Sequence, residues 1–175
     1  MLNNKLDFLL KSSKREKQKA FAVIFTIGLF GWIFNTYFGF FIDLTEVRCM
    51  PQTVYLGYPY TGELHKGDVI SYRASNRVML DLMTGRRIAK IVAGLPGDHV
   101  ISDKDGLRIN GQLVAERNPI SLTNLTAKGK KALDIDKVLQ EGEVLVIGKL
   151  PRSFDSRYWG VLPAKYIDRR IVPLF

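Results

Sequence analysis

The feature that most constrains the fold is an uncharged run from Phe21 to Ile42. Its 22 residues are rich in Phe, Ile and Leu and include no Asp, Glu, Lys or Arg. A helix of this length spans roughly 33 Å at about 1.5 Å per residue, which is enough to cross the hydrocarbon core of a bilayer. We therefore expect a transmembrane helix over residues 21–42, between a short segment 1–20 and a larger domain 43–175.

The charges on either side of this run indicate its orientation. Segment 1–20 is basic, with six Lys and Arg residues against Asp7 and Glu16, whereas Asp43 and Glu46 follow the run. The positive-inside rule then places segment 1–20 in the cytoplasm and domain 43–175 in the periplasm or another extracytoplasmic space, anchored to the inner (cytoplasmic) membrane. The run is longer than the core of a signal peptide and ends without a small-x-small cleavage site, so we expect an uncleaved anchor. Membrane lipid is an expected partner, and the net charge of +9 is interpreted as a topology signal rather than a nucleic-acid site.

The outer domain is expected to be mainly β. Short runs of alternating or continuous apolar residues are typical of strands and are bounded by turn residues; they lie at 53–56, 69–72, 87–92, 99–101, 107–109, 112–114 and 144–147. Asp105-Gly106 and Asn110-Gly111 favour hairpin turns, which predicts an antiparallel meander. The polar segment 117–137 is interpreted as a surface excursion.

Lys90 is the first candidate site residue. It lies in the alternating run 87–92, where Ile88 and Val92 share its face of the predicted strand. An ammonium group held against branched aliphatic side chains loses hydration, and desolvation favours the neutral amine that can accept a proton. Lys66 and Lys149 lie beside turn residues and are expected to be solvated instead.

Cys49 is the only cysteine, so an intramolecular disulfide is excluded. An unpaired thiol in an oxidising compartment calls for a functional reason. The two histidines, His65 and His99, lie beside turn residues and form no Cys/His cluster. We interpret them as surface residues and expect neither a metal site nor a cofactor.

Two motifs resemble those of type I signal peptidases. Lys90-Ile-Val-Ala-Gly-Leu-Pro-Gly-Asp98 is similar to the lysine box of that family, and Ser153-Phe-Asp-Ser-Arg-Tyr-Trp-Gly160 to its C-terminal box. Their order after a membrane anchor is also that of the family, and the resemblance covers about residues 20–165. Cys49-Met50-Pro51 has one residue between the nucleophile position and the proline, which is similar to the conjugative-transfer (TraF-like) branch.

The resemblance implies a signal-peptidase-like, coiled antiparallel β-structure and a Ser–Lys dyad that cleaves signal peptides after a small-x-small motif. By position, Cys49 stands in place of the serine nucleophile and Lys90 is the general base. Ser153 resembles the serine that hydrogen-bonds this lysine, and Asp155 and Arg157 resemble a supporting ion pair. The implied partner is a precursor with a signal or leader peptide, and the TraF-like branch points to a pilin precursor in conjugative transfer.

The chain departs from the family pattern at three points. The nucleophile is Cys rather than Ser, Val47 stands where a Ser or Thr often assists the oxyanion hole, and 148–152 lacks an acidic-Asn pair. Two alternatives to a hydrolytic peptidase therefore stay open. One is a transpeptidase that cyclises a pilin by passing a thioester to an amine. The other is an inactive periplasmic assembly factor of a transfer apparatus.

Overall fold

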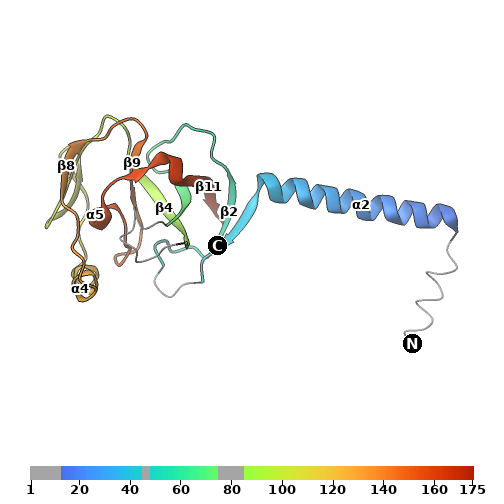
Figure 1. Cartoon of the computed structure of the whole chain (residues 1–175), viewed down its shortest axis with the longest axis horizontal. Helices are drawn as coiled ribbons and strands as arrows, with labels where there is room; N and C mark the ends of the chain where they lie inside the picture. The colour runs from blue at the N-terminus through green and yellow to red at the C-terminus, as the bar shows by residue number, and fades with distance from the viewer. Residues whose placement is uncertain (1–12, 45–47, 75–84) are drawn as a thin grey trace. The chain divides into compact units, whose positions relative to one another are not determined.

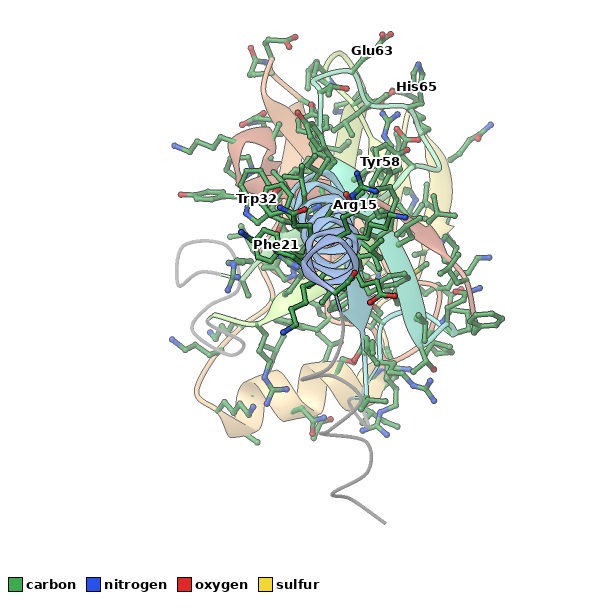
Figure 2. The ribbon with its side chains drawn as sticks, turned by 90° about the vertical axis from the view of Figure 1, so that its right-hand side faces the viewer. Arg15, Phe21, Trp32, Tyr58, Glu63 and His65 are labelled. Atoms are coloured by element: carbon green, nitrogen blue, oxygen red, sulfur yellow. The ribbon has the colours of Figure 1, made fainter. Side chains whose placement is uncertain are left out.

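The computed structural model describes residues 13–44, 48–74 and 85–175, which form two compact units, 1–39 and 40–175. The first unit contains helix α2, Lys14–Tyr37 (Figure 1). Ser13 begins this helix because its side chain accepts a hydrogen bond from the Glu16 N–H, while the Glu16 carboxylate accepts one from the Ser13 N–H. The helix has no buried residue, and Figure 2 shows Phe21 and Trp32 projecting from it. The length of this helix and the mean hydropathy of 1.6 in its most apolar 18-residue window are compatible with a single-pass membrane anchor.

Helix α2 ends five residues earlier than the expected span. Phe38 is extended, with φ −119° and ψ 150°, and Gly39–Ile42 forms strand β1. Phe41 of this strand packs against the Tyr55 ring, with centroids 5.4 Å apart. The apolar run therefore continues past the helix because its last residues belong to a sheet, and the expected helix over 21–42 needs this correction.

The described strands of the second unit form two mostly antiparallel sheets, as expected for a mainly β domain. The larger sheet has seven strands in the order β1 (Gly39–Ile42), β2 (Val54–Pro59), β11 (Ile167–Pro173), β3 (Val69–Arg73), β4 (Arg87–Gly94), β9 (Glu143–Ile147) and β10 (Leu162–Pro163). The smaller sheet has four strands in the order β7 (Gln112–Ala115), β6 (Gly106–Ile109), β5 (His99–Asp103) and β8 (Ile135–Val138).

The predicted hairpin at Asn110-Gly111 is present. Both residues have positive φ, 52° and 82°, as a type I′ turn requires, and Ile109 pairs with Gln112 across it. In the preceding hairpin Asp103 pairs with Gly106, so the turn lies one residue earlier than the predicted Asp105-Gly106.

The polar segment 117–137 has more structure than expected. Asn118 caps helix α4 (Pro119–Ala127) by accepting hydrogen bonds from the N–H groups of Ile120 and Ser121. Strand β8 then pairs with β5, so the end of the segment belongs to the smaller sheet. Two short helices complete the unit, α5 (Ser156–Trp159) and the 3-10 helix η1 (Ala164–Tyr166).

Alternation along β4 places its two faces in different parts of the core. Ile88 and Val92 pack in a cluster with Cys49, whereas Ala89 packs in another cluster with Met50 and its neighbours. Lys90 has the same parity as Ile88 and Val92, so its side chain lies on the Cys49 face of the strand.

Candidate active site

Lys90 is a fully buried lysine in the middle of β4. Its exposed fraction is 0%, and Ile70 of β3 lies directly opposite it. The Lys90 Nζ donates a hydrogen bond of 2.8 Å to the Ser153 Oγ, which is also fully buried. Among the described residues Lys90 forms no ion pair with a carboxylate, and hydrogen bonding of a buried amine to a neutral hydroxyl is typical of a reactive amine rather than of a structural ion pair.

Gly148 packs closely against both Ser153, the partner of Lys90, and the backbone of Cys49. A methyl group at Gly148 would lie 2.0 Å from the Ser153 Oγ and 2.6 Å from the Cys49 carbonyl oxygen. The Leu150 N–H also donates to that carbonyl oxygen, at 3.2 Å. Cys49 itself is 7% exposed. The loop after β9 therefore holds the backbone of Cys49 next to the serine that binds Lys90.

Asp155 and Arg157 form a buried, two-pronged ion pair. The Arg157 Nε and Nη2 donate to the two oxygens of the Asp155 carboxylate, each at 2.7 Å. Asp155 also accepts a hydrogen bond from the Gly148 N–H at 2.9 Å, and Arg157 donates to the Ser153 carbonyl. Burial disfavours the charge on Arg157, but the hydrogen bonds and negative charge of Asp155 outweigh it and raise the pKa of Arg157. The pair fixes both Gly148 and Ser153.

Arg117 supports this ion pair from the segment before α4. Its Nε donates to the Arg157 carbonyl oxygen at 2.8 Å, and the Arg157 Nη1 donates to the Glu116 carbonyl oxygen at 2.7 Å. Arg117 also bonds the Leu133 carbonyl and the Asp134 carboxylate, each at 2.7 Å. This role could not be predicted from the sequence, because an arginine in a polar segment is usually solvated.

Tyr72 is a further buried group that the sequence did not single out. It lies on β3, two residues from Ile70, and packs edge-on against the Trp159 ring at 6.3 Å. Burial, followed by the ionisable Cys49 and Asp155 nearby, raises the pKa of the Tyr72 phenol well above its ordinary value. Its hydroxyl therefore stays protonated in a site that contains two acidic groups.

A cavity of about 590 Å³ adjoins the loop that carries Gly148. The loop residues Gly148, Lys149 and Leu150 form one wall, and strand β7 with the residues that follow it forms another. Arg157 contributes to the lining as well. Gly148, Leu150 and Arg157, which contact Cys49 or Ser153, thus also line this cavity.

The remaining sequence candidates are placed as follows. His65 is exposed, with its Nε2 3.6 Å from Glu63 at the margin of the domain (Figure 2), and His99 is exposed beside Asp136. Lys149 is exposed, as expected. Lys66 is exposed as well, as expected, and its Nζ also lies 2.7 Å from the nearly buried Asp98 carboxylate.

Val47, which bears on the oxyanion hole, lies outside the described residues. No described residue accepts a backbone hydrogen bond from the Cys49 N–H.

The family model for signal peptidase, peptidase S26, matches residues 20–174. The chain belongs to this family. Peptidases of the S26 family are hydrolases, and signal peptidases act on precursors that carry signal peptides.

Among solved structures, a signal peptidase I from Enterococcus faecalis V583 is 26% identical, with a TM-score of 0.40 over 65% of this chain and 100% of the other. None of the curated proteins matches the chain significantly.

Proposed function

We propose that this signal peptidase family member is a membrane-anchored endopeptidase that removes a signal or leader peptide with a Cys49/Lys90 dyad. The observation that carries the proposal is the hydrogen bond from the fully buried Lys90 Nζ to the Ser153 Oγ. A methyl group on Gly148 would overlap both this Oγ and the Cys49 carbonyl oxygen, so Gly148 packs tightly against both residues. An amine such as that of Lys90 has little structural use, because burial of an ammonium group with one neutral partner is unfavourable.

The mechanism begins with the thiol of Cys49. A free cysteine thiol ionises at about pH 8.5, far below a serine hydroxyl, so a lysine can accept its proton with less tuning. The Cys49 thiolate attacks the scissile carbonyl carbon, and the Cys49 N–H stabilises the oxyanion of the tetrahedral intermediate. The C–N bond then breaks, the leaving amine takes the proton from Lys90, and a thioester remains on Cys49.

Release of the leader requires a water molecule. Lys90, now neutral, accepts a proton from this water as it attacks the thioester carbonyl. The C–S bond breaks, which frees the leader carboxylate and restores the Cys49 thiolate beside the Lys90 ammonium group. Ser153 orients the amine in both steps, and the Asp155–Arg157 pair orients Ser153.

The spacing of Cys49-Met50-Pro51 favours the conjugative-transfer branch and hence a pilin precursor as substrate. The experiment is co-expression of such a precursor with the wild-type chain, followed by mass spectrometry of the product. Hydrolysis yields the cleaved linear product, and cyclisation yields a product lighter by one water. Cys49→Ala should leave the precursor intact, and Cys49→Ser should retain little processing. Full processing by Cys49→Ala would overturn the dyad and favour an assembly factor.

A further inference from the structure

Tyr72 is a fully buried phenol that the proposed mechanism does not use. Its exposed fraction is 0%, and it belongs to the same buried cluster as Cys49. Burial removes its hydroxyl group from water, which is less favourable than burying a phenylalanine ring of the same shape. A phenylalanine could also pack edge-on against Trp159, so the hydroxyl group calls for an explanation beyond packing.

The pairing of β3 with β4 places Tyr72 beside Lys90. Tyr72 lies directly opposite Ile88, and Lys90 is two residues further along β4, on the same face. Diagonal neighbours of this kind have Cα atoms about 7–8 Å apart, a distance that aromatic and long side chains can bridge. Ile70, directly opposite Lys90, is aliphatic. On this face of β3, Tyr72 is therefore the residue that brings a polar group to the dyad.

Two acidic groups act on the Tyr72 hydroxyl. After burial, which has the largest effect, the charges of Cys49 and Asp155 raise the pKa of the phenol. The Asp155 carboxylate already accepts hydrogen bonds from Arg157 on both oxygens, and a third from the Gly148 N–H. Cys49 is therefore the group for which a further donor matters more.

A thiolate in this cluster is unfavourable without such a donor. Cys49 is 7% exposed and packs with Ile88 and Val92, and apolar surroundings disfavour the ionised thiol. Lys90 supplies the opposite charge, but its amine also donates to Ser153. A phenol that keeps its proton adds a donor without adding charge, and hydrogen bonds to an ionised acceptor are roughly twice as strong as neutral ones.

The other charged or titratable groups around Cys49 have partners of their own. The Tyr55 hydroxyl donates to the Gln52 carbonyl at 2.8 Å, and the Tyr158 hydroxyl accepts from the Asn118 N–H at 2.8 Å. The guanidinium group of Arg48 donates to a threonine side chain. Besides Tyr72, the set comprises Arg48, Tyr55 on β2, Lys90 on β4, and Asp155, Arg157 and Tyr158 at α5.

We propose that Tyr72 is a positioning residue of the dyad, whose hydroxyl group stabilises the Cys49 thiolate beside the Lys90 ammonium group. This inference rests on the proposed Cys49/Lys90 dyad and adds a third group that prepares the nucleophile. Its effect on Cys49 can be measured without a substrate, so it can be tested separately from peptide cleavage.

The test compares the rates at which iodoacetamide alkylates the full wild-type and Tyr72→Phe chains in detergent micelles, followed by mass spectrometry. Cys49 is the only cysteine, so one cysteine adduct reports on it. Tyr72→Phe keeps the ring and removes only the hydroxyl group. Alkylation at pH 7 should be about fivefold to tenfold slower than in wild type, because a hydrogen bond to the thiolate is lost. The two rates should converge at about pH 10, where a thiol ionises without assistance.

Tyr158→Phe is the matched control, because it removes a phenol hydroxyl from the same buried cluster, one that binds the Asn118 N–H. It should lower the midpoint of thermal unfolding but leave the alkylation rate at pH 7 close to that of wild type. An unchanged rate in Tyr72→Phe, or an equal loss in both variants, would overturn the role of Tyr72.

Precursor processing provides a second measurement. Tyr72→Phe should lower kcat with little change in KM, because the hydroxyl group acts on the nucleophile rather than on substrate binding. A higher KM with unchanged kcat would contradict the assignment. Slower alkylation of Tyr72→Phe in a chain that processes no precursor would leave the role of Tyr72 intact and refute the proposed function instead.

Discussion

Arg117 and Arg157 each donate a hydrogen bond to a backbone carbonyl in the other's segment. Arg117 bonds the Arg157 carbonyl at 2.8 Å, and Arg157 bonds the carbonyl of Glu116, the residue before Arg117, at 2.7 Å. Through this reciprocal contact, the segment between β7 and α4 fixes the start of α5. Arg117, which lies outside both family-like motifs, therefore helps to hold Arg157 and, through it, Ser153 in place.

Arg117→Met should therefore destabilise the domain. It removes four hydrogen bonds of a nearly buried guanidinium group and leaves the Leu133 carbonyl without that donor. We expect a loss of about 2–4 kcal/mol in the free energy of unfolding, measured by chemical denaturation. Arg108→Met, on β6 and paired with Asp103 only at 3.5 Å, should cost less than about 1 kcal/mol. Equal effects of the two substitutions would contradict this role for Arg117.

Lys90→Met preserves length and apolar packing but removes the amine. Processing should fall below a few per cent of wild type, while the midpoint of thermal unfolding stays within a few degrees or rises, because a buried amine is replaced by a well-packed thioether. Lys104→Met is the control, since Lys104 is exposed in the turn between β5 and β6. Lys66 is unsuitable as a control, because its Nζ pairs with the Asp98 carboxylate. Normal processing by Lys90→Met would show that the dyad is wrong.

Gly148→Ala should inactivate the site through sterics alone. The added methyl group would overlap the Ser153 Oγ at 2.0 Å and the Cys49 carbonyl oxygen at 2.6 Å. We expect at least a hundredfold loss of processing, because the Ser153 Oγ and the Cys49 carbonyl oxygen would both have to move away from their positions in the site. The matched change Gly142→Ala, where a methyl group meets nothing within 4 Å, carries backbone strain because φ is +79° and should lower stability without specific loss of turnover. Wild-type turnover by Gly148→Ala would refute the proposed close packing.

Asp98 should make stability depend on pH in acid. Burial opposes its ionisation, but hydrogen bonds from the Leu95 N–H, Lys66 and Asn110 outweigh it and lower the pKa of Asp98 below 3.8. The resulting stability is present above the ordinary pKa and is lost as the pH falls through the lower value in the folded state. Asp98→Asn should therefore cost about 1–3 kcal/mol at neutral pH, and the difference from wild type should shrink as the pH falls below the ordinary pKa of a carboxyl group. A difference independent of pH would contradict this assignment.

Topology can be checked with a reporter fused after Phe175. The basic residues of segment 1–20 and the acidic Asp43 predict that the C-terminal domain is extracytoplasmic. A reporter that is active only outside the cytoplasm should therefore be active in this fusion. Activity of a cytoplasm-only reporter at the same position would reverse the orientation and remove the proposed access to leader peptides.

The sequence predicted those parts of the fold that depend on local pattern. Alternation identified β4 and the face of Lys90, and the Asn110-Gly111 pair identified a type I′ turn. The polar segment before β8 was assigned to the surface, although Asn118-Pro119 carried a recognisable helix start.

Strand β11 was missed because its pattern depends on partners elsewhere in the sequence. It lies between β2 and β3 although it carries Asp168, Arg169 and Arg170. Arg87 pairs with Asp168, and Asp68 with Arg170. Charges that are neutralised across strands look like loop residues when only the local sequence is considered. The same limit applied to Arg117, whose acceptors lie 15 to 40 residues away along the chain.

The early end of α2 has a consequence for the membrane itself. Of the run Phe21–Ile42, only the 17 residues Phe21 to Tyr37 are helical, which corresponds to about 26 Å at about 1.5 Å per residue. This is a few ångströms less than a typical hydrocarbon core of about 30 Å. Such negative hydrophobic mismatch is relieved when the bilayer thins locally or when the stems of Lys17 and Lys19 extend along the acyl chains. A short span of this kind favours thin bilayers. Around the anchor, the hydrocarbon layer that separates the two aqueous phases would be thinner than elsewhere in the membrane.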